Sequence, residues 1–426
     1  MKNKKNLLKL MLILLLLVPV FSFAEESKTY TVKESINEKD KEYKNSEKSQ
    51  NAILFLDGNS ILSNINVEKS GDSNDNISNS AVVCLNNATL DISSSTINTN
   101  GSNSSGIVSA KGGIITAKEL TITTKKEKSY CLVSQDDGDL SVDKGTYETK
   151  EKNSPVIYAT SDVIVKNATL NALKSEAVIT NGSRNVKLTS NDQNKNENTN
   201  SFMNIYIFND NSKNDETKFD LYNSEVETNK GDTFLVSANA TINIENNKII
   251  NNDNGAFIKI IKDNNFSFKD VNVTASLAKQ KVAGNIVIDS ASLYLNLNEK
   301  SVITGEINSD KKAKYVYLTI SEDSVVNLTN DSYVDELSNA VSDNSNIYLN
   351  GHKLYVNNVE VKGNTGVYKE EKEKEEEQKE EESKTESKKK NNFIYIVLVV
   401  LVIVISVLFY FLKIKGKKKI EHNDNL

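Results

Sequence analysis

The sequence is poor in cysteine, proline, histidine and arginine, and it has no tryptophan. Its two cysteines, Cys84 and Cys131, exclude a disulfide-rich scaffold, so the fold must rely on its core and its backbone ladders. Because Arg184 is the only arginine, recognition of carboxylates or phosphates by guanidinium groups is disfavoured as a main activity. A formal net charge of −6 argues against a nucleic-acid partner. No phosphate-binding loop, zinc-ligand spacing or nucleophile elbow is present.

One long uncharged segment lies near the end of the chain. Residues Phe393–Leu412 contain no charged side chain, and a helix of this length spans a hydrocarbon core of roughly 30 Å. Tyr395 and Tyr410 lie near its two ends, where membrane interfaces favour aromatic rings, and five lysines follow within residues 413–419. A buried core helix is the alternative. We predict one transmembrane helix at 393–412 and a basic cytoplasmic tail at 413–426, with everything before them outside the cell.

The beginning of the chain agrees with this orientation. Residues 1–24 combine a basic start, an apolar run and a Ser-Phe-Ala cleavage site, which predict a signal peptide cleaved after Ala24. Residues 25–50 are polar and are predicted to form a lead-in or a capping strand. Residues 367–392 are rich in lysine and glutamate and predict a stalk, either a solvated helix or a fluctuating coil. The many asparagines and lysines are typical of AT-rich genomes and suggest a Gram-positive bacterium.

Between these segments, short apolar runs recur with a nearly constant period. Spacings of 25, 25, 23, 23, 33, 23 and 24 residues separate the first positions, which are Leu90, Ile115, Leu140, Val163, Val186, Phe219, Ile242 and Phe266. Two residues later come Ile92, Ala117, Val142, Val165, Leu188, Leu221, Ile244 and Phe268. Seven residues after the first positions come Ile97, Ile122, Tyr147, Leu170, Gln193, Val226, Ile249 and Val273. Of these 24 positions 23 are apolar, whereas a composition with 38% apolar residues would give about nine.

Two further rows follow the same period. Most repeats carry an apolar residue seven positions before the first one, which we interpret as a third strand: Val83, Val108, Val133, Val156, Ile179 and Leu235. Four positions after the first one lies a polar row, interrupted by Glu119 and Lys144: Asn64, Ser94, Asn167, Asn223, Asn246 and Asp270. Asparagine and aspartate tolerate the left-handed backbone that tight corners need. This row forms either a ladder of stacked polar side chains or ordinary solvated turns.

A single repeat cannot bury its own apolar face, but stacked repeats can, with parallel strands about 4.8 Å apart. The predicted fold is therefore all-β: one parallel β-helix, or solenoid, with about 23–25 residues per coil over residues 51–366. The long spacing contains Asn191–Ser201, which we predict to be a loop, either a binding loop or a plain one. Cys84 and Cys131 fall two coils apart, with Cys131 inward and Cys84 outward. A disulfide needs Cα atoms within about 7 Å, and two coils separate these cysteines by more than that along the stack. Two free thiols are therefore expected.

Several stretches resemble a known family. They are GDSNDNISNSAVV, SDVIVKNATLNALKSEAVI and the closing runs GNIVIDSASLYLNL, SVITGEINSDKKAKYVYLTI and NIYLNGHKLYVNN, and they span most of residues 71–358. They resemble secreted, adhesin-like β-helix proteins of the pectin-lyase-like superfamily from anaerobic and gut bacteria. This resemblance implies a right-handed coil and an extracellular location more than it implies an activity. The chain departs from such proteins in being poorer in glycine and richer in asparagine and lysine.

An enzymatic alternative follows from the same resemblance, because many such β-helices cleave acidic glycans with aspartate clusters, a basic residue or a histidine. The candidates here are Asp136, Asp137, Arg184 and His352. An inverting glycosidase needs two carboxyl groups about 6.5–9.5 Å apart. Asp136 and Asp137 are adjacent and also fit a turn, Arg184 fits an exposed corner, and His352 lies far along the stack. We therefore assign no catalytic residue.

Two further segments are weaker candidates for binding. Asp72, Ser73, Asn74, Asp75 and Asn76 offer oxygen ligands at alternating spacing, but the run lacks the glycine and the distal glutamate of an EF-hand loop. Calcium is a weak alternative, and no cofactor is expected. Tyr315 and Tyr317 would either stack on sugars or pack within the sheet.

The combined prediction is a type I, single-pass surface protein whose solenoid stands on a charged stalk. Its predicted role is non-catalytic adhesion to an extracellular polysaccharide or protein surface through the side of the solenoid. The alternatives are a polysaccharide lyase or hydrolase and a passive structural surface protein. A binder should show an aromatic or charged stripe, an enzyme should show converging acidic and basic groups, and a passive protein should show neither.

Overall fold

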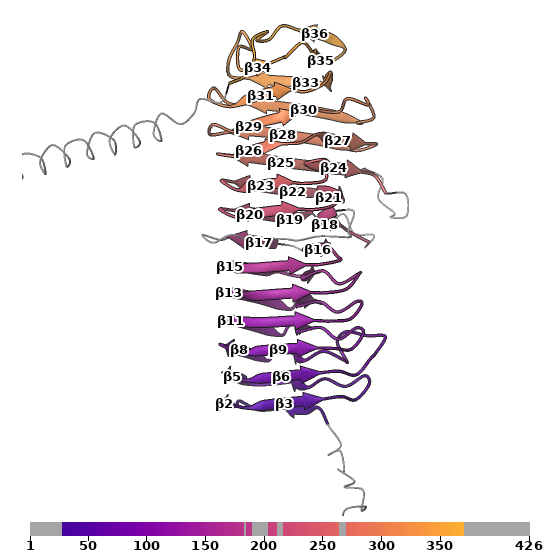
Figure 1. Ribbon diagram of the computed structural model, residues 1–426, viewed down its shortest axis with the longest axis vertical. Coiled ribbons are helices and arrows are strands. Elements are labelled where there is room, and N and C mark those ends of the chain that lie inside the picture. Colours follow the sequence, from indigo (N-terminus) through magenta and orange to yellow (C-terminus); the bar gives the residue numbers. More distant parts are fainter. Residues whose placement is uncertain (1–27, 183–184, 190–202, 211–215, 264–269, 370–426) are drawn as a thin grey trace, which may run out of the picture. The chain divides into compact units, whose positions relative to one another are not determined.

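The computed structural model describes residues 28–182, 185–189, 203–210, 216–263 and 270–369. These residues form an all-β parallel solenoid of about 13 turns, seen as a stack of strands in Figure 1. The described part contains no α-helix. The predicted signal peptide, the loop at 191–201, nearly all of the stalk, the transmembrane helix, the tail and Arg184 lie outside the described residues.

The strands lie on the sides of the stack in two large sheets and three small ones. Sheet A consists of β1 (Tyr30–Val32), β4 (Ile53–Phe55), β7 (Val82–Cys84), β10 (Ile107–Ala110), β12 (Leu132–Gln135), β14 (Ile157–Ala159), β16 (Val178–Asn181), β18 (Met203–Phe208), β21 (Asp232–Ser237), β24 (Ile258–Ile261) and β27 (Ile286–Asp289). Sheet B consists of β2 (Asn37–Lys39), β3 (Glu42–Asn45), β5 (Asn59–Ser63), β6 (Asn66–Lys69), β8 (Thr89–Ser93), β9 (Thr96–Thr99), β11 (Ile114–Thr124), β13 (Asp139–Thr149), β15 (Val163–Ala172), β17 (Asn185–Thr189), β19 (Thr217–Tyr222), β22 (Ala240–Glu245), β25 (Asn272–Ala278), β28 (Ser292–Asn298), β30 (Tyr315–Ile320) and β33 (Glu336–Asn339). The small sheets contain β20 (Glu225–Thr228) with β23 (Lys248–Asn251), then β26 (Lys281–Ala283), β29 (Val302–Gly305), β31 (Val325–Leu328) and β34 (Ile347–Tyr348), and finally β32 (Ser332–Val334), β35 (Leu354–Val356) and β36 (Val359–Val361).

The ladder of sheet B confirms the predicted repeat from Leu90 to Ile242. Each predicted first position pairs in parallel with the next, from Leu90 opposite Ile115 to Phe219 opposite Ile242. The next prediction is wrong, because Ile242 pairs with Ala275 and not with Phe266. β25 buries Val273, Ala275 and Leu277 in the core, and this long alternating run sets the register in place of the closer one.

The predicted third strand is correct in position, but Val83, Val108, Val133, Ile179 and Leu235 point outward. The prediction of Val156 in this row is wrong, because Val133 pairs with Tyr158 and Val156 lies in the central core. Val82, Ile107 and Leu132 belong to the central core, whereas Val83, Val108 and Val133 form a separate cluster on the outer face of sheet A. The prediction that Cys84 points outward is therefore wrong, since it lies buried in the central core. Side chains alternate between faces with a period of two, so a slip of one residue inverts every assignment in a strand. Both thiols are buried and free, as expected.

The polar corner row adopts the left-handed backbone predicted for it. Its members have φ between 48° and 62°: Asp40, Asn64, Ser94, Glu119, Lys144, Asn167, Asn223, Asn246 and Lys279. Glu119 and Lys144, which interrupt the asparagine pattern, share this conformation, so the stacking of turns imposes it on whichever residue lies there. The prediction for Asp270 is wrong, because the shifted register of β25 places Lys279 at this corner.

The two ends of the described solenoid differ. Residues 30–45, predicted to be a lead-in or a cap, contribute β1, β2 and β3, which pair in parallel with β4, β5 and β6 and so form a first turn. At the other end β36 pairs with β35 in the antiparallel direction, the only antiparallel ladder among the described strands. This hairpin lies at the end of the stack in Figure 1 and ends the parallel ladder.

Candidate functional site

The candidate residues of the enzymatic alternative do not come together in the described part of the chain. Asp136 and Asp137 are exposed corner residues between β12 and β13, with φ of 50° and 60°. The same corner in the neighbouring turns is formed by Asn86 and Asn87 and by Lys111 and Gly112, all with positive φ. His352 lies in the turn between β34 and β35, at the other end of the stack. Asp136 and Asp137 are therefore turn residues, and no acid–base pair with His352 exists.

The aspartates of the candidate calcium run hold a loop together. Asp72 Oδ1 accepts the backbone N–H of Ser102 at 2.8 Å, and the Asp75 carboxylate accepts the N–H groups of Ile77 and Ser78. The described residues contain no group of three or more histidine, cysteine or acidic side chains that could hold a metal ion. The loop packs Ile77 onto the outer face of sheet A.

That outer face carries a continuous row of mostly apolar side chains, of which the sequence pattern predicted Val83, Val108, Val133, Ile179 and Leu235 as a third strand. We call it the sheet A outer row; its members, paired strand by strand, are Leu54, Val83, Val108, Val133, Tyr158, Ile179, Tyr206, Leu235, Lys259 and Val287. Val83, Val108 and Val133 are fully buried, and Ile77 and Tyr130 pack against their cluster. From Tyr158 onward the row is only half-buried. In the sequence, this row is indicated by strands whose consecutive residues are both apolar.

Aromatic rings and neutral polar groups form the middle of this row. Tyr130 stacks on Tyr158 with ring centroids 5.1 Å apart, and Tyr206 stacks on Phe208 at 4.7 Å. The Tyr206 hydroxyl lies 3.3 Å from Ser237 Oγ. Burial raises the pKa of Tyr130 to about 12 and also raises the pKa values of Tyr158 and Tyr206, so these hydroxyls stay neutral. The middle of the row therefore presents aromatic rings with neutral hydroxyl groups.

Tyr315 and Tyr317 point outward from sheet B, because Val316 and Leu318, which alternate with them along β30, are buried. The structure adds Tyr294 from the adjacent strand β28, directly opposite Tyr317. Tyr294 lies 23 residues before Tyr317 in the sequence. The three tyrosines, Tyr294, Tyr315 and Tyr317, can therefore be recognised as neighbours only when the register of β28 and β30 is known.

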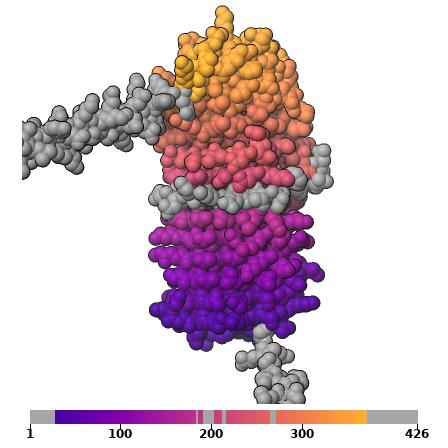
Figure 2. Space-filling view, in the orientation of Figure 1, coloured from indigo at the N-terminus to yellow at the C-terminus, as the bar shows by residue number. Residues whose placement is uncertain are grey.

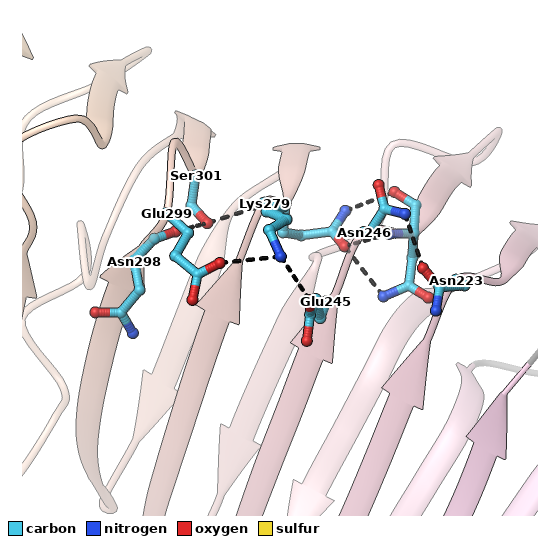
Figure 3. A network of polar contacts seen from close by, with 9 residues as sticks. Asn223, Glu245, Asn246, Lys279, Asn298, Glu299 and Ser301 are labelled. Carbon is cyan, nitrogen blue, oxygen red and sulfur yellow. Dashed lines mark hydrogen bonds and ion pairs between the residues drawn. The ribbon is translucent and has the colours of Figure 1, made fainter.

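A polar ladder follows the corner row along the turns of the second half of the stack (Figure 3). Asn246 donates to Asn223 Oδ1 at 2.8 Å, and Lys279 Nζ bridges Glu245 and Glu299 at 3.0 and 3.1 Å. These side chains are largely exposed, so each ion pair contributes little to stability. Of the two alternatives for the corner row, a polar ladder and solvated turns, these turns show the ladder, whose groups bind one another.

Lys69 is an unusual buried cation. Its side chain is 1% exposed, and its Nζ donates to the backbone carbonyl of Glu47 at 2.8 Å and more weakly to that of Gly71 at 3.5 Å. It lies at a surface depression of about 530 Å³ that Lys44 and Lys125 also line. Burial lowers the pKa of Lys69 to about 8, because the low-dielectric surroundings disfavour the ammonium form.

Replacing Lys69 by methionine is expected to change the pH dependence of stability. In the unfolded chain the amine loses its proton near pH 10.5, but in the folded protein it does so near pH 8. The unfolded state therefore binds more protons between these values, and this group makes the free energy of unfolding rise with pH across that window. Urea unfolding at pH 7, 8, 9 and 10 should show that Lys69→Met lacks this contribution.

The exposed Lys44 provides the control for this series. It forms an ion pair with Glu42 at 2.7 Å, and that interaction raises its pKa. Lys44→Met should therefore follow the wild-type pH profile between pH 8 and 10. Parallel profiles for Lys69→Met and the wild type would contradict a buried amine with a lowered pKa.

Comparison of the chain with protein-family models, with curated proteins and with solved structures finds no significant match. Within the described ranges, no helix has the length and apolar character that crossing a membrane requires.

Proposed function

We propose that the chain is a cell-surface, adhesin-like protein that binds extracellular glycan or protein surfaces through the side of its solenoid without changing them chemically. The observation that supports this most is the sheet A outer row. The core needs only the inward residues of these strands, such as Val82, Ile107 and Leu132. The outer row lies beyond this core, and its half-buried part from Tyr158 to Leu235 leaves apolar surface of the kind that marks interaction sites.

The solenoid architecture fits such a role. Each turn contacts only its neighbours, so outward residues vary without disturbing the core, and a flat side extends over many turns. Figure 2 shows the turns as closely packed layers along one face. The proposal places the solenoid outside the cell, on the stalk at 367–392 and the transmembrane helix at 393–412, with residues 1–24 as its signal peptide. A right-handed coil belongs to the same proposal, since parallel crossovers are right-handed in about 98% of cases.

The proposal is tested by surface depletion. The full-length chain, kept in solution with mild detergent, is incubated with insoluble polysaccharides, cell walls and matrix proteins, with and without calcium. Both the protein left in solution and the sugar ends released are measured. Depletion without release of sugar ends is expected.

A charged double variant connects this binding to the sheet A outer row. Ile179→Lys with Leu235→Lys introduces two ammonium groups at half-buried outward positions. It should weaken binding about tenfold or more, because both charges must lose water at the contact. Thr116→Lys, the same change at an exposed outward position of sheet B, is the control and should bind normally.

Two outcomes would replace the proposal. Release of sugar ends that is lost in Asp136→Asn or His352→Ala would indicate a glycan-cleaving enzyme. No depletion on any surface would indicate a passive structural protein.

A further inference from the structure

Three tyrosines gather on the outer face of sheet B near the end of the stack. Tyr294 on β28 lies directly opposite Tyr317 on β30, and Tyr315 lies two residues earlier on β30, on the same face. The ring of Tyr294 lies 5.7 Å from that of Tyr315 and 6.4 Å from that of Tyr317. Tyr294 is 39% exposed, so a large part of its surface faces solvent.

These rings are not needed by the core. The inward neighbours Leu293, Leu295, Val316 and Leu318 are fully buried on the opposite face. Earlier strands of the same ladder carry Thr241 and Thr274 in line with Tyr294, so the sheet is also built with small polar residues at this place. The tyrosines therefore add aromatic surface to an outer face that does not require it.

Another tyrosine pair in the same part of the protein shows what a packed arrangement looks like. Tyr333 and Tyr355 stack with ring centroids 4.9 Å apart and planes inclined by 5°. Lys311 Nζ lies 3.9 Å from the centre of the Tyr333 ring. Each ring of that pair faces the other, and the lysine contacts Tyr333, whereas Tyr294 presents its surface to solvent.

Neutral hydrogen-bonding groups lie in the next row of the same face. Ser276, Asn296 and Thr319 occupy successive strands, about 4.8 Å apart, beside Thr274, Tyr294 and Tyr317. Asn296 donates to Ser276 Oγ at 3.3 Å, which is a long contact that leaves amide and hydroxyl capacity for a ligand. Aromatic rings beside amides and hydroxyls match sugars, which have apolar ring faces and hydroxyl edges.

The charged groups around Tyr294, Tyr315 and Tyr317 indicate which class of glycan can bind there. The Glu336 carboxylate accepts a hydrogen bond from the Tyr315 hydroxyl, and this interaction raises the pKa of Tyr315 to about 12. Asp335 accepts the backbone N–H of Val316 at 2.7 Å. The nearby cation Lys314 is paired with Asp270 at 2.6 Å. Carboxylates beside the rings repel an acidic polysaccharide and leave an uncharged one as the best fit.

The angles between the ring planes indicate the shape of the ligand. The Tyr294 plane is tilted by 51° to that of Tyr315 and by 78° to that of Tyr317. Rings can lie together on a flat crystalline surface only if they are coplanar. Inclined rings instead contact different faces of a single, twisted chain.

We infer that Tyr294, Tyr315 and Tyr317 form a binding site for a single chain of an uncharged, soluble polysaccharide lying across the strands of sheet B. This inference rests on the proposed function and names a ligand class for it. The site is separate from the sheet A outer row, so the two surfaces can be tested independently.

Affinity electrophoresis of the full-length chain tests the site. Native gels contain a soluble neutral polysaccharide such as a galactomannan or a mixed-linkage glucan, or an acidic one such as polygalacturonate, and depletion on crystalline cellulose is measured in parallel. The wild type should be retarded by a neutral chain only. Tyr294→Ala with Tyr317→Ala should weaken retardation about tenfold or more, because two stacking faces are lost.

Two control variants separate ring stacking from folding. Tyr294→Phe keeps the ring and should retain binding, whereas Tyr333→Ala removes a ring outside the trio and should also bind normally. Circular dichroism of the double variant should be unchanged, since its side chains point away from the core.

The remaining outcomes overturn the inference in distinguishable ways. Retardation by polygalacturonate, depletion on crystalline cellulose, or binding to a lysine-rich peptide in place of neutral glycans would each refute the ligand class. Neutral-glycan binding that survives Tyr294→Ala with Tyr317→Ala but is lost in Ile179→Lys with Leu235→Lys would refute the site and leave the proposed function standing. No binding of the wild type to any glycan or protein surface would refute both.

Discussion

Replacing Phe234 by alanine is expected to lower the free energy of unfolding by about 3–5 kcal/mol. Phe234 is fully buried inside the stack, and its ring makes edge-to-face contacts with Phe219 at 6.0 Å and with Phe257 at 5.8 Å. The three rings belong to three successive turns. Because each turn of a solenoid is stabilised only by its neighbours, the cavity left by this ring weakens two interfaces at once.

Guanidinium unfolding of the wild type, Phe234→Ala and Phe234→Leu measures this effect. The leucine variant keeps most of the buried volume and should lose less than about 1.5 kcal/mol. A loss below about 1 kcal/mol for Phe234→Ala would show that the neighbouring turns collapse into the space, and that the aromatic stack does not hold them in place.

Replacing Gly101 by alanine is expected to destabilise the protein by about 3 kcal/mol or more, through steric overlap between two turns. A Cβ atom on Gly101 would lie 1.9 Å from the backbone carbonyl oxygen of Gly71, far inside any allowed contact. The turns would have to separate. Their separation would break the hydrogen bonds from Asn100 N to Lys69 O at 2.7 Å and from Ser102 N to Asp72 Oδ1 at 2.8 Å.

Gly351 provides the comparison for this substitution. It has a φ of 85°, but a Cβ atom there would meet nothing within 4 Å. Gly351→Ala should therefore cost only the backbone strain of about 1 kcal/mol. Thermal unfolding of both variants distinguishes the two causes, and equal losses in the two variants would contradict a steric origin at Gly101.

The interior of sheet B could be predicted because its apolar residues alternate cleanly with polar ones. In β11 and β13 the buried positions Ile115, Ala117, Leu140 and Val142 recur at the predicted spacing and pair as expected. The conformation of the corner row could also be predicted from the sequence, because asparagine favours the left-handed backbone and occurs at many of these turns. Stacking imposes the same conformation on Glu119 and Lys144, which no local preference indicates.

The candidate binding surfaces depended on information that the sequence pattern lacks. Val83, Ile179 and Leu235 lie in strands that are apolar at adjacent positions, so periodicity alone could not separate the inward row from the outward one. The tyrosine trio required the register that places Tyr294 opposite Tyr317. The register after Ile242 was also ambiguous, because two alternating runs compete within a short segment and only packing in the core chooses between them.

The sequence by itself determined the period, the stacking of parallel strands and the free thiols. It also predicts the signal peptide, the stalk and the membrane anchor, which stay predictions. Only the tertiary structure decided which of two neighbouring apolar residues faces the core, which ladder partner follows an insertion, and which side chains meet on the outer faces. The physical reason is that a periodic pattern specifies repeated local geometry, whereas facing and register are chosen by packing between turns.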